Sequence, residues 1–210
     1  MRTRLLALAL IVPFAALASC KSGPNTAYTP LEPERRDTSK ADALNQQAAA
    51  LMAEDPEKAE ALLREALAAD LYHGPAHNNL GVLFLKQNKL YEAAGEFEWA
   101  CKLLPGHPDP RLNLSLTLES AGRYDQATDH VRTALQIHPG HIASLQQLAR
   151  LELMHPDRPK TAMAGSPSGG RTPEARAELR ANLSEIAMRG ETDAWKDWAR
   201  LQIVKLDGGR

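Results

Sequence analysis

The sequence predicts an all-α protein built from repeated helix hairpins. From residue 41 onward, apolar residues recur at spacings of three and four, as on one face of a helix. The pattern then repeats with a period of 34 residues, and proline-glycine pairs stand at equivalent places in successive repeats. The composition suits a folded core, since 43% of the 210 residues are hydrophobic and 24% are charged.

The charge balance argues against nucleic acid or an anionic lipid surface as an electrostatic partner. Lys and Arg number 25 against 26 Asp and Glu, which gives a net charge of -1. A partner is therefore expected to be recognised by shape and local contacts. The oligomeric state is left open.

The first 19 residues are predicted to be a signal peptide. Arg2 and Arg4 precede an apolar run from Leu5 to Leu17, which is shorter than the roughly 20 residues of a membrane-spanning helix. The run ends in Leu17-Ala18-Ser19-Cys20, which resembles the bacterial lipobox. That resemblance implies that Cys20 becomes the mature N-terminus and carries diacylglycerol and palmitate. The alternative is an ordinary signal peptide with a chance cysteine at its cleavage site.

The segment after the cysteine is predicted to be a tether. Residues 20–40 contain three prolines and show no helical period. Lys21 stands where an aspartate would indicate inner-membrane retention, so the resemblance to lipoproteins favours an outer-membrane anchor facing the periplasm.

Small and bulky residues alternate along the predicted hairpins. The small positions are Ala59, Ala93 and Ala127, then Ala66, Ala100 and Ala134; the bulky positions are Leu63, Phe97 and Val131. Small residues let two helices approach while large neighbours fill the groove between them. Pro105-Gly106 and Pro139-Gly140 end the second helix of each unit.

The pattern resembles the tetratricopeptide repeat. The matching residues of the second unit are Leu80-Gly81, Phe84, Ala93, Phe97, Ala100 and Pro105, with His77 where the family usually has tryptophan. The resemblance implies a helix-hairpin solenoid of about three repeats plus a partial fourth over residues 41–156. The first unit has Gln46-Gln47 instead of Leu-Gly and is predicted to act as a cap.

Two further helices are predicted after a loop over residues 157–172. Thr172 precedes Pro173 and Glu174, a helix start signal, and residues 173–206 are expected to cap the solenoid. Trp195 and Trp198 lie on one face of the last helix. They are expected either to pack within the cap or to form an exposed docking patch.

Neither a cofactor, a metal site nor an enzyme activity is predicted. His73, His107 and His141 recur at the repeat period, but stacked repeats lie about 8–10 Å apart, too far to share one metal ion. Cys101 occupies a core position. A remote alternative is an envelope hydrolase around His155, Ser166 and Asp193.

The resemblance implies that a protein or extended peptide binds along the concave side, which is lined by first helices. A row of amides recurs there at 34-residue intervals: Asn45, Asn79, Asn113 and Gln147. The expected apolar contacts are Leu44, Val82, Leu112 and Leu116, and the expected charge-selecting residues are Lys86 and Arg150. The amides are expected either to hold a peptide backbone or only to bridge adjacent helices.

These predictions together describe a lipid-anchored adaptor or scaffold in the bacterial cell envelope. Small repeat lipoproteins of this kind resemble pilotins of type IV pili and secretion systems. The alternative is therefore a stoichiometric, pilotin-like subunit of a pilus or secretion apparatus.

Overall fold

The computed structural model describes residues 36–154 and 172–208, and every regular element within these residues is a helix. The chain divides into two units, Met1–Pro30 and Leu31–Arg210, and all described residues belong to the second. The predicted signal peptide, Cys20, most of the tether and nearly all of the 157–172 loop lie outside the described residues. The predicted all-α class is confirmed.

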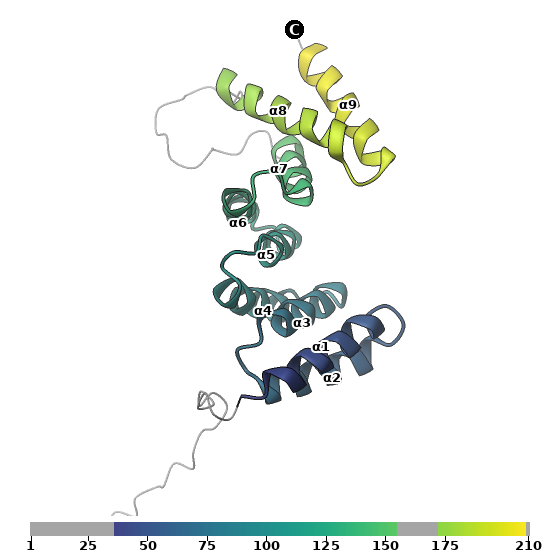
Figure 1. The fold of residues 1–210 in the computed structure, drawn as a ribbon. Coiled ribbons are helices and arrows are strands. Elements are labelled where there is room, and N and C mark those ends of the chain that lie inside the picture. The colour runs from purple at the N-terminus through teal and green to yellow at the C-terminus, as the bar shows by residue number, and fades with distance from the viewer. Residues whose placement is uncertain (1–35, 155–171, 209–210) are drawn as a thin grey trace, which may run out of the picture. The chain divides into compact units, whose positions relative to one another are not determined.

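The described residues form nine helices (Figure 1). They are α1 (Thr38–Leu51), α2 (Pro56–Ala69), α3 (Gly74–Lys86), α4 (Leu90–Leu103), α5 (Asp109–Ser120), α6 (Tyr124–Ile137), α7 (Ile142–Met154), α8 (Pro173–Arg189) and α9 (Asp193–Gly208). The pairs α1–α2, α3–α4 and α5–α6 pack as hairpins, and each hairpin contacts the next through α2–α3, α4–α5 and α6–α7.

Local capping explains where these helices begin. The Asp55 carboxylate accepts a hydrogen bond from Lys58 N at 3.0 Å at the start of α2. The His73 ring accepts one from Ala76 N at 3.1 Å at the start of α3. These contacts satisfy N–H groups that have no partner inside the helix.

The turns inside the second and third hairpins share one backbone feature. Asn88 and Gly122, which stand 34 residues apart, both have positive φ, at 59° and 73°. Glycine and asparagine adopt this left-handed conformation more easily than other residues, so the chain can reverse directly after α3 and α5. The repeat in the sequence is therefore also a repeat in backbone geometry.

Close contact between α3 and α4 depends on Gly81. A Cβ atom at this position would lie 2.7 Å from the Phe97 ring, which is fully buried. The equivalent residue of the next hairpin is Ser115, whose hydroxyl donates to the Ala127 carbonyl at 2.7 Å. Both small residues allow the second helix of the hairpin to approach the first.

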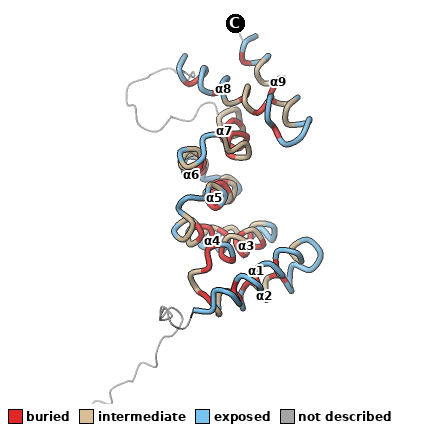
Figure 2. The backbone as a smooth tube through the Cα atoms, in the orientation of Figure 1, coloured by how far each residue is buried: buried red, intermediate tan, exposed pale blue. Residues whose placement is uncertain are grey.

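The buried side chains form two hydrophobic clusters. The larger cluster runs from α1 to α7, and the smaller joins α7, α8 and α9. Figure 2 marks the buried residues in red along the helices. Helix α7 contributes to both, with Leu148 and Leu151 in the first and Leu145 and Ala149 in the second. Helix α8 packs against α7, and α9 packs against α8. No helix of the described segments is long and apolar enough to cross a membrane.

Candidate functional site

The first helices of the hairpins form a continuous layer. Contacts join α1 to α3, α3 to α5 and α5 to α7, whereas no such contact joins α2 to α4 or α4 to α6 in the described chain. The odd-numbered helices therefore approach one another more closely than their even-numbered partners. We call the layer formed by α1, α3, α5 and α7 the inner layer.

Helix α3 shows which side chains this layer leaves accessible. Ala76, His77, Leu80, Leu83 and Phe84 are buried, and they face the other helices of the stack. The remaining positions form a separate stripe, in which Asn78, Asn79 and Val82 are half-buried and Lys86 is exposed. The predicted contact residues of α3 therefore share one accessible face.

Two hydrogen bonds link asparagines across the inner layer. Asn79 Nδ2 donates to Asn45 Oδ1 at 2.8 Å, and Asn113 Nδ2 donates to Asn78 Oδ1 at 3.0 Å. These amides thus bridge adjacent helices, as one of the two sequence interpretations expected. Each amide has one acceptor oxygen and two N–H groups, so a single bond leaves further hydrogen-bonding capacity.

Gln147 does not extend this row as an accessible residue. It is only 3% exposed, and its Nε2 donates to Glu119 at 2.9 Å and lies 3.4 Å from the Ser115 hydroxyl. Arg150 Nη2 contacts both Gln147 Oε1 at 2.6 Å and Glu119 Oε2 at 2.5 Å. The longer glutamine side chain is held by α5 and its neighbour on α7, so we remove Gln147 from the candidate contacts.

The predicted apolar and charged contacts differ in accessibility. Leu44 and Leu112 are each 9% exposed and belong mainly to the core. Val82 and Leu116 are half-buried, and Lys86 is exposed. The remaining candidates on the inner layer are therefore Asn45, Asn79, Asn113, Val82, Leu116, Lys86 and Arg150.

A buried carboxylate joins the start of α1 to the end of α2. Asp70 is 1% exposed, and it accepts hydrogen bonds from Arg36 at 2.8 and 3.0 Å, from the Thr38 hydroxyl at 3.1 Å and from Tyr72 N at 3.0 Å. Burial opposes its ionisation, but these donors outweigh burial and lower the pKa of Asp70 below its ordinary value.

This cluster corrects the predicted boundary of the tether at residue 40. Helix α1 begins at Thr38, because the Asp37 carboxylate caps it by accepting from Lys40 N at 2.9 Å. Arg36, which lies two residues before α1, forms an ion pair with Asp70. This ion pair was not predicted, because Arg36 precedes the periodic apolar pattern.

The histidines of the repeats make separate contacts. His73 Nε2 lies 2.8 Å from Asp42, and His141 Nε2 lies 3.2 Å from Asp109, each linking one hairpin to the next. His77 packs between Glu96 at 2.6 Å and the Leu71 carbonyl at 2.9 Å. No group of three His, Cys, Asp or Glu residues within the described chain is placed to hold a metal ion.

Neither Cys101 nor the residues of the hydrolase alternative form a reactive site in the described segments. Cys101 is half-buried, and burial raises the pKa of its thiol above the ordinary value, which disfavours the reactive thiolate. His155 and Ser166 lie outside the described residues. Asp193 is exposed at the start of α9 and pairs with Lys196 at 3.2 Å.

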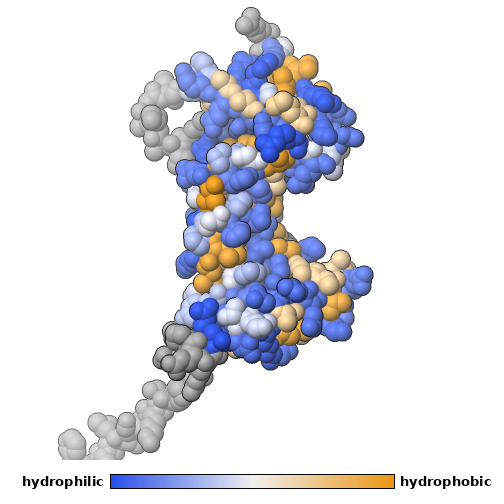
Figure 3. Space-filling view, in the orientation of Figure 1, coloured by the Kyte–Doolittle hydropathy of each residue, from blue (hydrophilic) through white to orange (hydrophobic). Residues whose placement is uncertain are grey.

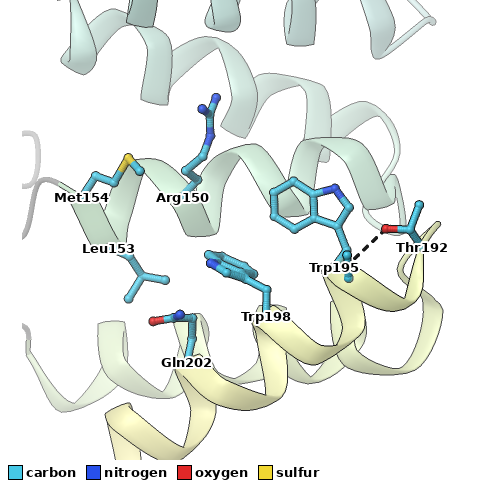
Figure 4. A pocket seen from close by; sticks show the side chains of 8 residues that line it. Arg150, Leu153, Met154, Thr192, Trp195, Trp198 and Gln202 are labelled. Atoms are coloured by element: carbon cyan, nitrogen blue, oxygen red, sulfur yellow. Dashed lines mark hydrogen bonds between the residues drawn. The ribbon is translucent and has the colours of Figure 1, made fainter.

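A second accessible feature lies between α7 and α9. Trp195 and Trp198 pack edge to face, with ring centroids 5.1 Å apart and planes at 83°. They line a groove of about 540 Å³ together with Leu153, Met154 and Gln202 (Figure 4). The sequence singled out both tryptophans but not their partners, which only the packing of α8 brings near.

Comparisons with known proteins agree on the fold. The tetratricopeptide repeat family model matches residues 49–108. PilF of Pseudomonas aeruginosa is 20% identical with a TM-score of 0.65, over 82% of this chain and 71% of that chain. MamA of Desulfovibrio magneticus is 17% identical with a TM-score of 0.57, over 72% and 78%.

A third similar structure contains a bound peptide. The first tetratricopeptide domain of Spaghetti, bound to an HSP90 peptide, is 14% identical with a TM-score of 0.54, over 57% of this chain and 96% of that chain. No curated protein sequence matches. The match to the tetratricopeptide repeat model over residues 49–108 agrees with the predicted repeats, and the described fold is a helix-hairpin solenoid.

Proposed function

We propose that the protein is an adaptor or scaffold that binds a segment of another protein along its inner layer. The observation that carries this proposal is the set of asparagines on α1, α3 and α5. Asn45 and Asn79 are joined by one hydrogen bond, and both remain half-buried with unused amide groups. Such groups can pair with a peptide backbone without reading its side chains.

The residues beside these amides define the expected partner. Val82 and Leu116 offer half-buried apolar surface, and Lys86 adds an exposed positive charge that forms no ion pair with a described residue. An extended segment with apolar and acidic side chains would match them. The peptide bound to the tetratricopeptide domain of Spaghetti supports a peptide as the class of ligand.

The inner-layer proposal is tested by crosslinking and pulldown from native membranes. The Asn79→Ala, Asn113→Ala double variant should lose a partner that the wild-type protein retains. A matched control is the Gln126→Ala, Gln136→Ala double variant, which removes two exposed amides from α6 instead. Circular dichroism verifies that both variants fold. Equal retention by both variants would assign the asparagines to helix bridging alone.

The proposed location is a cell-envelope membrane, more specifically the outer membrane, with anchoring through lipidated Cys20. The support is the apolar leader followed by Leu17-Ala18-Ser19-Cys20. Labelled palmitate should enter the wild-type protein but not a Cys20→Ala variant, and membrane fractionation should find the wild type in the outer membrane. An unlabelled, processed wild-type protein would contradict the anchor.

A stoichiometric subunit of a pilus or secretion apparatus remains the alternative form of this function. Quantitative mass spectrometry of the crosslinked material separates the two forms. A fixed ratio to one assembly favours the subunit, whereas variable, low occupancy of a partner favours the adaptor.

A further inference from the structure

The groove between α7 and α9 is a surface that the repeats do not account for. Its floor and walls come from Leu153 and Met154 of α7 and from Trp195, Trp198 and Gln202 of α9. Figure 4 shows the side chains of α9 rising toward α7 across this space. A volume of about 540 Å³ is within the range of pockets that bind small ligands and anchoring side chains.

The groove exists because α8 holds α9 away from α7. Helix α8 packs on both neighbours, whereas the backbones of α7 and α9 do not approach each other closely. Ala199 and Leu206 of α9 belong to the smaller hydrophobic cluster, and Trp198 packs against it. Trp195 is not part of that cluster, and Met154 is 63% exposed.

The described residues of the lining are apolar or offer hydrogen-bond donors, and none of them is a carboxylate. Arg150 is the one charged residue among them, and Nη2 of that side chain is fixed by Glu119 and Gln147. No described residue accepts a hydrogen bond from Arg150 Nε or Nη1, or from either indole N–H. An occupant that complements this lining has a large apolar group and nearby acceptor oxygens, preferably anionic.

A polypeptide fits these features better than an acyl chain does. Tryptophan, arginine and methionine are the residue types enriched where proteins bind one another, and the groove combines all three. Apolar surface also continues along α9, where Leu201 is 52% and Val204 66% exposed, and Figure 3 shows hydrophobic surface over the C-terminal helices. An acyl chain would leave the indole and guanidinium donors unpaired.

We infer that this groove docks a partner segment that inserts one large apolar side chain between Trp195 and Met154 and sets a carboxylate near Arg150. Because the partner is a protein, this inference rests on the proposed adaptor function. The site is nevertheless separate from the asparagines of α1, α3 and α5. Arg150 lies on α7, the last helix of the inner layer, so one partner can occupy both surfaces.

The three tryptophans allow a direct test by NMR of the full-length chain, because each gives one indole N–H signal. The probe is the blocked peptide Gly-Ser-Phe-Glu-Ser-Gly, compared with versions carrying Ser for Phe or Lys for Glu. The Phe-Glu peptide should shift the Trp195 and Trp198 signals saturably and leave Trp99 unchanged. The Ser version should not bind, and the Lys version should bind several-fold more weakly.

Protein variants then assign the contacts. Trp195→Ala should weaken the Phe-Glu peptide about tenfold or more, and Met154→Ser, at an exposed position, should weaken it several-fold. Arg150→Met should abolish the preference for Glu over Lys. Met188→Ser is the matched control, because it removes an exposed methionine of α8 that does not line the groove, and it should leave affinity unchanged.

Specific outcomes would overturn the inference. It is wrong if the Phe and Ser peptides act alike, or if Trp195→Ala and Met154→Ser bind as the wild type does. It is also wrong if decanoate shifts the two indole signals while no peptide does, since the groove would then hold an acyl chain. The Phe-Glu peptide should bind the groove of the Asn79→Ala, Asn113→Ala variant as it binds the wild type. The groove is therefore tested independently of the inner-layer proposal.

Discussion

The hairpins of α3–α6 and the C-terminal pair α8–α9 use similar helix packing but differ in how completely their bulky side chains are covered. Phe97 of α4 and Val131 of α6 are fully buried between neighbouring helices. Leu201 and Val204 of α9 are exposed, and Trp195 and Trp198 are only half-buried.

The difference follows from what lies on either side of each helix. A hairpin inside the series has another hairpin before and after it, so both of its faces are covered. Among the described helices, the backbone of α9 approaches only α8 closely, and few of its side chains reach the cluster that it shares with α7. The series therefore ends in a helix with unused apolar surface, and this surface borders the groove that we assign to a partner.

The largest expected effect on stability comes from creating a cavity among the packed repeats. Phe97→Ala should lower the free energy of unfolding by about 3–5 kcal/mol, because a fully buried aromatic ring against Gly81 leaves a cavity when removed. Urea unfolding followed by circular dichroism measures it. Trp198→Ala in the less covered region should have a smaller effect, and an equal or larger loss would break the comparison.

Removing the ion pair between Arg36 and Asp70 should have the next largest effect on stability. Asp70→Asn should destabilise the protein by about 1.5–3 kcal/mol, because a buried acceptor loses its charge-assisted hydrogen bonds. Unfolding midpoints at neutral pH measure this loss. An unchanged midpoint would mean that Arg36 and Asp70 do not pair in solution.

The same residue predicts an acid dependence. The native pKa of Asp70 is lower than its unfolded value, so the unfolded chain takes up the proton first as the pH falls. Its stabilisation is complete above the unfolded pKa of about 3.9 and is lost as the pH falls through the lower native pKa. Wild type and Asp70→Asn should therefore converge in stability below about pH 4.

The sequence predicted the repeats well because each unit solves the same packing problem with the same residue types. Gly81 and Phe97 occupy positions of the 34-residue pattern, and the structure brings them into contact. Asn88 and Gly122 repeat for the same reason, since each hairpin must reverse in the same way. A packing pattern that recurs several times within one chain can be recognised from that single sequence.

The parts that were not predicted depend on distant geometry. Arg36 forms a hydrogen bond with Asp70, but it precedes the first residue of the periodic apolar pattern. The asparagine spacing predicted a row but not that Gln147 would turn toward Glu119 and become buried. The spacing of Trp195 and Trp198 was equally compatible with a packed cap, and only the position of α8 creates the groove.

A smaller effect is expected where α8 begins. Thr172 is its N-cap, and its hydroxyl accepts from Ala175 N at 3.3 Å. Thr172→Ala should destabilise by about 1 kcal/mol, whereas Thr172→Ser should retain most of the stability. Because α8 holds α9 away from α7, hydrogen exchange measured by mass spectrometry should rise in α8 and α9 of Thr172→Ala but not in α3 and α4. A uniform rise would mean that the two regions unfold as one unit.

The smallest effect is expected on the open face of α9. Val204→Ser should change the free energy of unfolding by less than about 0.5 kcal/mol, because the side chain it shortens is 66% exposed. The urea midpoint should stay the same at low and high protein concentration. A loss above about 1.5 kcal/mol would be far outside the range for a surface substitution. Such a loss, if it grew with protein concentration, would show that a second copy of the chain covers this face. The contrast between covered repeats and an open C-terminal helix would then hold for the single chain but not for the protein in solution.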